Sequence, residues 1–384
     1  MQFASEIKSK LPTAGTTIFS IMSALAAKHN ALNLAQGFPN FPVSEKLISL
    51  VNAQMKAGAN QYAPMQGVQL LRERIAEKMH NRYNISYHSE TEITITAGGT
   101  QAIFTAIQAV IRDGDEVIIF DPAYDSYAPA VTLAGGVTIH YDLMAPDYKI
   151  DWQAVKKLIT QRTRLIIINT PHNPSGTILT VDDLQQLEAL ISHSNILVLS
   201  DEVYEHIIFD GHMHQSVCAF PALAERSFVV YSFGKTYHAT GWKLGYVLAP
   251  EALTTEFRRI HQFNVFSVNT PMQYALADYM QDAGNYELLP PFYQEKRDKF
   301  VSFLQGSRFK IMPCSGSYFQ LLDYSNITDE KDTEYAKQLT IEKGIASIPV
   351  SVFYQRKIDN KVLRFCFAKD DETLQRAAEK LLSV

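Results

Sequence analysis

The order of apolar and polar positions along the chain predicts a sheet within the first two thirds of the sequence. From about residue 92 onward, short β-rich runs alternate with segments of helical spacing, which is typical of βα units that build a largely parallel sheet. The expected strands are 93–96, 116–120, 165–168, 196–199 and 228–231. Helical spacing is clearest at 70–80, 100–111 and 180–191.

Beyond about residue 269 the pattern changes, and it indicates a second, smaller α+β domain. There the expected helices are 271–280, 291–304 and 332–343, and the expected strands are 318–322 and 362–367.

Polar or glycine-containing segments follow each predicted strand of the first domain. They are 98–100, 121–124, 169–173, 201–204 and 232–235. Ligands of open α/β sheets bind beyond the carboxyl ends of the strands, so these segments are expected to converge on one edge.

Composition narrows the class of protein further. A chain of 384 residues exceeds the size of a single hydrophobic core, so two domains are expected. A net charge of -5 gives no basic surface for nucleic acid or anionic membrane. With no long apolar run, no apolar core in the first ten residues and three widely spaced cysteines, we expect a cytoplasmic protein without a secretory signal or membrane span.

Lys235 is the main candidate for chemistry, because it lies where an apolar strand meets a glycine-containing loop. A desolvated lysine there can act as an amine nucleophile toward an aldehyde cofactor. An isolated lysine is usually a solvated surface charge, and only the surroundings of Lys235 argue otherwise.

Two further segments are typical of a cofactor site, although each has a structural alternative. The Gly98-Gly99-Thr100 turn opens a helix and can bind phosphate, or it is simply a tight βα turn. Asp201 ends an apolar strand, where it needs a cation such as the protonated pyridine nitrogen of pyridoxal 5'-phosphate (PLP), or it is a helix N-cap. Dinucleotide and ATP motifs are absent from the sequence.

Other candidates depend on context. Asn173 and Tyr124 are suited to contact a cofactor, but Asn-Pro is ordinary turn chemistry and an aromatic after proline often serves packing. Arg364 lies in an apolar strand and needs an anionic partner, either a substrate carboxylate or a buried structural ion pair. His206 and His214 are expected in a polar loop with His212, because no further ligands at metal-site spacing accompany them.

Together these segments resemble the fold type I, PLP-dependent aminotransferases of class I/II. The similarity runs from residues 33–39 to residues 364–367, and 232–245 is its most specific part. That segment is similar to the glutamine transaminase K and kynurenine aminotransferase subgroup, and closer still to bacterial methionine aminotransferases. The resemblance implies a mostly parallel seven-stranded sheet, with a large domain of residues 45–275 and a small domain of residues 1–44 and 276–384.

The resemblance also implies roles around the cofactor ring. Lys235 would form the Schiff base with PLP, and Asp201 would pair with the pyridine nitrogen. Tyr204 and Asn173 would bind the ring 3-oxygen, while Tyr124 would stack on the ring.

The phosphate would be held by Gly99, Thr100, Ser232 and Lys243, with Gly98 as the leading turn glycine. Many aminotransferases have arginine at the position of Lys243. Lysine is typical of the subgroup named, so the phosphate would meet a point charge instead of a planar fork.

For the substrate, the resemblance assigns Arg364 and the backbone of Gly37 to the α-carboxylate, with Asn173 and Phe19 also in the pocket. Tyr62 would reach the phosphate of the neighbouring subunit in a homodimer. Further aromatic lining is expected from Phe38, Tyr62 and Tyr124.

The function implied is transfer of the amino group of an uncharged amino acid (methionine, aromatic, glutamine or kynurenine) to a 2-oxo acid by a ping-pong mechanism. A cysteine-S-conjugate β-lyase is the alternative, because both reactions begin with the same carbanion. A PLP-binding transcription regulator would need a DNA-binding module, and the sequence has no basic helix-turn-helix ahead of the aminotransferase pattern.

Overall fold

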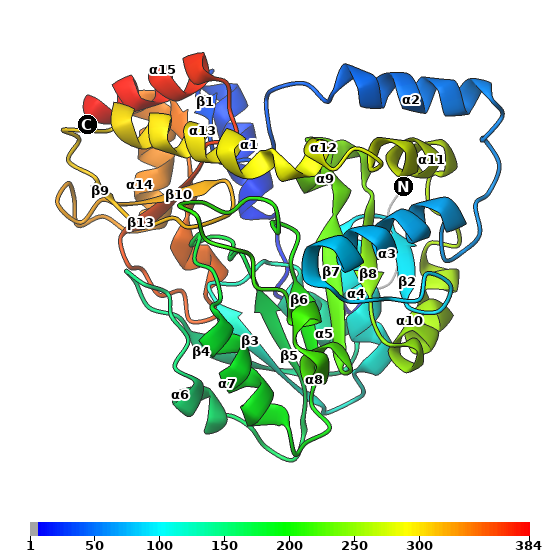
Figure 1. The fold of residues 1–384 in the computed structure, drawn as a ribbon. Coiled ribbons are helices and arrows are strands. Elements are labelled where there is room, and N and C mark those ends of the chain that lie inside the picture. The colour runs from blue at the N-terminus through cyan, green and yellow to red at the C-terminus, as the bar shows by residue number, and fades with distance from the viewer. Residues whose placement is uncertain (1–6) are drawn as a thin grey trace.

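A seven-stranded sheet forms the centre of the protein, whose residues 7–384 are described by a computed structural model (Figure 1). Its strands, in spatial order, are β2 (Ile93–Thr96), β8 (Gly245–Leu248), β7 (Ser227–Ser232), β6 (Leu197–Asp201), β5 (Thr163–Asn169), β3 (Glu116–Asp121) and β4 (Val137–Asp142). The strands from β7 to β4 are parallel, and β8 is antiparallel to both of its neighbours. The predicted α/β class with a mostly parallel seven-stranded sheet is confirmed.

Alternate side chains of the central strands enter two different cores, which explains why these strands are apolar runs. Val117 and Ile119 of β3 pack in one core, with helices α4 (Gly99–Val110) and α10 (Glu251–Asn264), whereas Ile118 packs in the other. A parallel sheet covered on both faces leaves no solvated side for polar residues. All five predicted strands are confirmed, to within two residues at each end.

Strands β4 and β8 were not predicted. At the edge of the sheet, β4 carries polar residues and its side chains are partly exposed, so it lacks the apolar signal of the interior strands. Only four residues long, β8 begins at Gly245, the last residue of the segment 232–245 that was interpreted for its chemistry.

Helices cover both faces of this sheet, and several of them have local start signals. Thr180 and Asp183 form a reciprocal capping box at the beginning of α7, as expected of a polar pair at this spacing. The helices up to the end of this part of the chain are α2 (Glu45–Lys56), α3 (Gln69–Tyr83), α4 (Gly99–Val110), α5 (Tyr127–Leu133), α6 (Trp152–Lys156), α7 (Val181–Ile191), α8 (Pro221–Ala224), α9 (Phe233–Thr236), α10 (Glu251–Asn264) and α11 (Thr270–Tyr279), with the short 3₁₀ helices η1 (Val217–Ala219) and η2 (Thr240–Trp242).

A second sheet of four antiparallel strands is built from the last third of the chain. Its order is β12 (Ile348–Pro349), β13 (Val362–Cys366), β10 (Phe319–Asp323) and β9 (Lys310–Ile311). Around it lie α12 (Gly284–Glu287), α13 (Leu289–Phe303), α14 (Asp332–Gln338), the π-helix η3 (Leu339–Lys343), the 3₁₀ helix η4 (Val350–Phe353) and α15 (Asp371–Leu382). The predicted helix 332–343 is therefore α14 and η3 in succession.

The first part of the chain joins this second sheet region. Strand β1 (Leu32–Asn33) pairs in parallel with β11 (Ile345–Ala346), and α1 (Ile18–Lys28) packs beside them. In Figure 1 the blue α1 and β1 lie next to the orange and red C-terminal elements. The domain boundaries at residues 45 and 275 stay a prediction.

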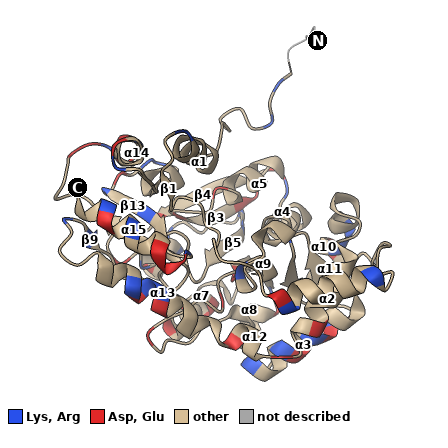
Figure 2. Cartoon of the chain, turned by 90° about the horizontal axis from the view of Figure 1, so that it is seen from above, with Lys and Arg blue, Asp and Glu red and all other residues tan. Residues whose placement is uncertain are grey.

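Charged residues of both signs lie mainly on outer helices such as α3, α13 and α15, while the strands of the large sheet have few of them (Figure 2). No helix within residues 7–384 is both long and apolar enough to cross a bilayer. Residues 1–6, part of the segment in which no secretory signal is expected, lie outside the described residues.

A buried ion pair ties α3 to the loop that follows β6. Lys78 of α3 donates to the carboxylate of Glu205, and their side chains are 6% and 3% exposed. Lys78 also donates to the hydroxyl of Tyr246, at 3.0 Å. Glu205 lies four residues beyond Asp201, so this pair fixes the path of the segment on which a candidate site residue lies.

We expect Lys78→Met to lower the free energy of unfolding by about 3–5 kcal/mol, because it leaves the Glu205 carboxylate buried without its partner. Urea unfolding followed by tryptophan fluorescence measures the change. Adding Glu205→Gln should recover part of the loss. The control is Lys46→Met, which breaks an exposed pair with Asp282 and should change stability by about 0.5 kcal/mol or less. Equal losses in the two single variants would contradict the expectation.

Candidate functional site

A cavity of about 240 Å³ opens at the carboxyl ends of the parallel strands, where ligands of open α/β sheets bind. The register aligns Asn169 of β5 with Asp201 of β6, and Ser232 ends β7 beside them. The cavity is lined by Phe19, Gln36, Gly37, Gly98, Gly99, Thr100, Ile103, Tyr124, Asn169, Asn173, Asp201, Val203, Tyr204, Ser232, Gly234, Lys235, Thr240, Lys243, Leu244, Phe319 and Arg364. All of the predicted site and lining residues except Tyr62 and Phe38 are among them.

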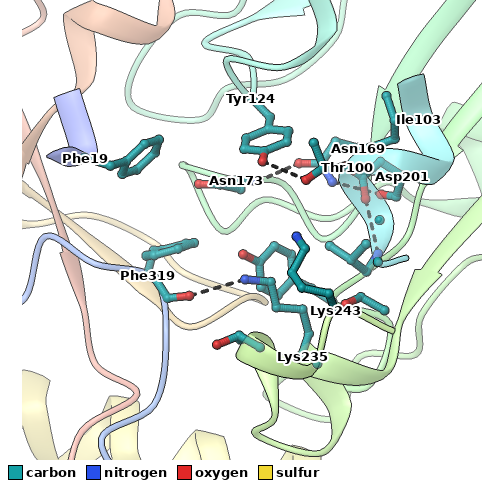
Figure 3. Close-up of a pocket in the computed structure, with 18 of the residues that line it drawn as sticks. Phe19, Thr100, Ile103, Tyr124, Asn169, Asn173, Asp201, Lys235, Lys243 and Phe319 are labelled. Atoms are coloured by element: carbon teal, nitrogen blue, oxygen red, sulfur yellow. Dashed lines mark hydrogen bonds between the residues drawn. The ribbon is translucent and has the colours of Figure 1, made fainter. Parts of the chain in front are cut away.

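Lys235 extends into the middle of this cavity (Figure 3). It belongs to α9, a single turn that begins directly after β7. Its Nζ donates to the Tyr318 hydroxyl at 2.7 Å and to the Gly37 carbonyl at 3.3 Å. Burial is the main cause that lowers the pKa of Lys235, to about 8. Lys235 therefore has a larger neutral, nucleophilic fraction at physiological pH than an exposed lysine.

Asp201 is the last residue of β6, and its side chain is almost completely buried. The Tyr127 hydroxyl donates to Oδ2 at 2.6 Å, and the Val203 amide donates to Oδ1 at 3.4 Å. Burial raises the pKa of Asp201 to about 6, in spite of these bonds. The next residues form turns, so the alternative of a helix N-cap is wrong. A carboxylate held in this way is stabilised in its charged form by a cation.

The part of the cavity at the start of α4 has the features of an anion site. Gly98 has a φ of 81°, which glycine adopts without strain, and α4 begins at Gly99. The first amides of α4 have no partners within the helix, so they are free to donate to an anion. A Cβ placed on Gly98 would lie 3.5 Å from Lys243 Nζ, so this ammonium lies directly beside the turn. The Thr100 hydroxyl is 3.0 Å from that of Tyr124.

Arg364 of β13 reaches the cavity from the four-stranded sheet and is only 1% exposed. Its guanidinium donates to Asn173 Oδ1 at 2.8 Å and to the Ala35 carbonyl at 2.9 Å, and it lies 3.9 Å from the centre of the Phe319 ring. Its buried Nε has no hydrogen-bond partner. Burial lowers its pKa to about 10. No carboxylate among the described residues forms an ion pair with it, so the structural ion pair is not found.

Several residues of the site were missed from the sequence. Asn169 donates to the Asp201 carbonyl at 2.8 Å and accepts from the Asn173 amide at 2.8 Å, so it orders two predicted residues. Its place at the end of an interior strand was a usable signal. Tyr127 and Tyr318 contact Asp201 and Lys235 through their hydroxyls, and nothing in their sequence neighbourhood distinguishes them from packing tyrosines.

Tyr62 and Phe38 lie outside the cavity. The side chain of Tyr62 is 80% exposed and contacts the edge of the Phe266 ring, with 5.1 Å between centres. Phe38 is partly exposed and lies under the ammonium of Lys369. The expectation that Phe38 lines the pocket is therefore wrong. Tyr62 does not line the cavity of its own chain, which leaves its predicted contact with a second chain untested.

The histidine-containing loop is also a correction. His206 and His214 are buried, and His214 Nε2 lies 2.9 Å from Glu202, whereas a polar loop would have left them in solvent. His206 lies 3.3 Å from Glu205. The two histidines lie next to buried carboxylates that follow β6, and of the three histidines only His212 is exposed.

The site as a whole combines an amine with a lowered pKa, a buried carboxylate, an anion-binding helix start and a buried guanidinium with a free donor. Such a set can hold a small phosphorylated cofactor with a cationic ring, attach it through an amine and bind a carboxylate next to it.

Known proteins resemble this chain along nearly its whole length. The model of the family "Aminotransferase class I and II" matches residues 29–381. The methionine aminotransferase of Escherichia coli is 50% identical over 375 residues, which cover 97% of each chain. The human kynurenine–oxoglutarate transaminase 1 is 32% identical over 393 residues, which cover 93% of each chain. An Escherichia coli crystal structure described as having a methionine aminotransferase function superposes with a TM-score of 0.97 and 50% identity, covering 99% of this chain and 100% of the other.

Proposed function

The chain belongs to the class I and II aminotransferases, which depend on PLP, and from that premise we propose that Lys235, Asp201 and Arg364 carry the reaction in the cavity described above. The observation that carries this proposal is their arrangement: a nucleophilic amine, a buried carboxylate and a buried guanidinium all line one cavity.

The residues present fit PLP. Asp201 is buried with a pKa raised to about 6, and the cationic nitrogen of the cofactor ring would offset the desolvation of its carboxylate. At the other end, the first amides of α4 and the ammonium of Lys243 would bind the phosphate, together with the Ser232 hydroxyl. Tyr124 would contact the face of the ring, and Tyr204 and Asn173 would donate to its oxygen.

When bound, PLP supplies an aldehyde that reacts with amines and a pyridine ring that withdraws electrons from the α-carbon of the substrate. Lys235 Nζ would hold the cofactor covalently before the substrate arrives. Once released, the same nitrogen would take the proton from the α-carbon and deliver it to the carbon of the former aldehyde, so that the amino group stays with the cofactor. Its lowered pKa favours the neutral form that this proton transfer needs. Asp201 holds its negative charge beside the ring throughout, because Tyr127 and the Val203 amide keep the carboxylate in place.

The α-carboxylate of the substrate would bind to Arg364 and to the backbone of Gly37. The free Nε of Arg364 can donate to one carboxylate oxygen, while the bonds to Asn173 and Ala35 fix the plane of the guanidinium. Amino acids and 2-oxo acids share this carboxylate, so one clamp serves both half-reactions.

For the side chain of the substrate, we propose methionine and other uncharged amino acids. Phe19 and Phe319 form an aromatic wall on the side of the cavity opposite Thr100 and Asp201, which suits an apolar or thioether side chain (Figure 3). Arg364 is the single arginine among the described lining residues, so an acidic side chain has no second guanidinium to meet. The 50% identity to the methionine aminotransferase supports the same substrate.

We further propose a homodimer in which Tyr62 completes the site of the other chain. Tyr62 and Phe266 form an exposed aromatic patch, with 80% and 55% of each residue exposed, and Phe263, which is 87% exposed, precedes Phe266 by three residues. The backbone that carries Tyr62 is nevertheless fixed, because Thr270 and Ser267 donate to the carbonyls of its two neighbours at 2.6 and 3.0 Å. A rigidly held but exposed aromatic patch is typical of an interface.

The free thiols of Cys218, Cys314 and Cys366 are all buried in the protein. Unpaired cysteines are typical of a reducing compartment, which supports a cytoplasmic location as a proposal.

We expect the purified protein to convert methionine and a 2-oxo acid acceptor into the 2-oxo acid of methionine and the aminated acceptor. Lys235→Ala should lose this activity and the covalent attachment of PLP, which borohydride reduction and peptide mass spectrometry detect. Lys243→Ala is the matched variant: it should bind PLP more weakly but still attach it at Lys235. Reduction onto a lysine other than Lys235 would contradict the assignment, and pyruvate with ammonia from cysteine S-conjugates as the main activity would favour the β-lyase.

Arg364→Lys should raise the KM for methionine and for the 2-oxo acid by about 10- to 100-fold, because a lysine ammonium cannot form the paired bonds of a planar guanidinium. Steady-state kinetics with each substrate varied in turn measures both constants. The exposed Arg356, paired with Asp142, gives the control Arg356→Lys, which should leave both unchanged. A rise for only one of the two substrates would rule out a shared clamp.

Mixing the inactive Lys235→Ala and Tyr62→Ala proteins under subunit exchange should restore activity. In a hybrid dimer one site would carry both lesions and the other would carry neither, so activity should approach about half that of the wild type per hybrid dimer. Activity assays during exchange and mass measurement of the native dimer follow the process. Activity that never exceeds the sum of the separate parents would show that each chain builds its site alone.

A further inference from the structure

The amine of Lys235 is held by a residue that none of the roles above includes. Its Nζ donates to the Tyr318 hydroxyl at 2.7 Å, and the same hydroxyl donates to the Gly37 carbonyl at 2.5 Å. The direct contact of Nζ with that carbonyl is longer, at 3.3 Å. Tyr318 therefore connects Lys235 to the backbone residue that would bind the carboxylate of the substrate.

Packing fixes the position of this hydroxyl. Tyr318 is completely buried, and three aromatic rings surround its own ring. The distances between ring centres are 5.1 Å to Tyr204, 4.9 Å to Phe319 and 5.9 Å to Tyr293. A side chain held in this way offers a single, rigid acceptor to a flexible lysine, which lowers the entropic cost of fixing the amine.

We propose that Tyr318 is a positioning residue for Lys235: its hydroxyl receives the amine whenever Lys235 is not attached to the cofactor and keeps it beside Gly37, on the side where the substrate binds. This inference rests on the proposed function and goes beyond it, since it concerns the interval after the substrate has released Lys235.

The hydrogen bonds of Tyr318 determine whether it raises or lowers the proton affinity of Lys235. Burial is the main cause that raises the pKa of Tyr318 well above its usual value, so its hydroxyl stays protonated. Its one proton goes to the Gly37 carbonyl, and its lone pairs accept from Lys235. An acceptor stabilises an ammonium more than a neutral amine, so Tyr318 raises the proton affinity of Lys235 above the value that burial alone would give. The other titratable or charged groups around Lys235 are Asp201, Tyr204, Lys243, Arg364 and Cys366.

The test compares Tyr318→Phe with wild type in the full-length enzyme loaded with pyridoxamine 5'-phosphate, which has an amine in place of the aldehyde and leaves Lys235 free. Brief pulses of deuterated acetic anhydride over a range of pH, followed by peptide mass spectrometry, give the pH midpoint for labelling of Lys235. This measurement does not depend on turnover. The matched control is Tyr293→Phe, which removes a buried hydroxyl without a hydrogen-bond partner from a neighbouring ring.

We expect the midpoint for Lys235 to fall by about 1 in Tyr318→Phe and to stay unchanged in Tyr293→Phe. In steady-state assays, kcat for Tyr318→Phe should fall by about 10-fold or more, because the amine is no longer held near the α-carbon. The phenylalanine keeps the ring and its packing, and thermal unfolding checks that the variant is folded.

Two results would overturn the inference. One is a labelling midpoint that does not change in Tyr318→Phe. The other is a higher KM with normal kcat, which would assign the hydroxyl to Gly37 alone. If instead the midpoint falls and the enzyme transfers no amino group in any form, the proposed function fails while the contact between Tyr318 and Lys235 stands.

Discussion

The burial of a carboxylate at the end of β6 is the constraint on which the rest of the site depends. Asp201 lies where five parallel strands end together, and its desolvation raises its pKa to about 6. The fold stabilises this position from several directions: Tyr127 from α5, the Val203 amide from the following turn, and Asn169 from the neighbouring strand. A carboxylate that is fixed so firmly and still lacks a full counter-charge is suited to bind a cationic ring. Water would solvate a flexible or exposed carboxylate, which would then gain less from such a ring.

The charges of the cavity extend this argument from the cofactor to the substrate. Lys235, Lys243 and Arg364 contribute three cationic groups to the lining, against the single carboxylate of Asp201. Burial lowers the pKa of Lys235 and of Arg364, because desolvation makes their cationic forms costly. A phosphate beside Lys243 and a carboxylate beside Arg364 would reduce that cost. The same electrostatic balance therefore favours both a phosphorylated cofactor and an α-carboxylate substrate.

The site residues that could be predicted from the sequence are those with a recognisable pattern in the neighbouring residues. Lys235, Asp201 and Gly98 each lie at the junction of an apolar strand and a turn, so the register of the sheet brings them together once the strands are identified. Edge strand β4 has no such apolar signal, and β8 is apolar but only four residues long, so both were missed. Tyr127 and Tyr318 act through single hydroxyl groups whose targets lie 74 and 83 residues away in the chain, so no local pattern distinguishes them. The exposure of Phe38 and the burial of His206 and His214 likewise depend on long-range packing.

The two sides of the cavity come from different parts of the chain, and this separation has a consequence for specificity. The groups suited to PLP lie on the carboxyl edge of the large sheet, whereas Arg364 and Phe319 lie on the four-stranded sheet, and Phe19 and Gly37 on the N-terminal segment that pairs with the last third of the chain. Substitutions on the second set can change which side chain the enzyme accepts without disturbing Asp201 or the anion site. Lys235 is the exception. Its backbone follows β7 of the large sheet, but its amine donates to Tyr318 and Gly37 on the other side of the cavity. The lysine thus joins the two halves of the site, and the geometry of that junction determines how a released amine meets the substrate.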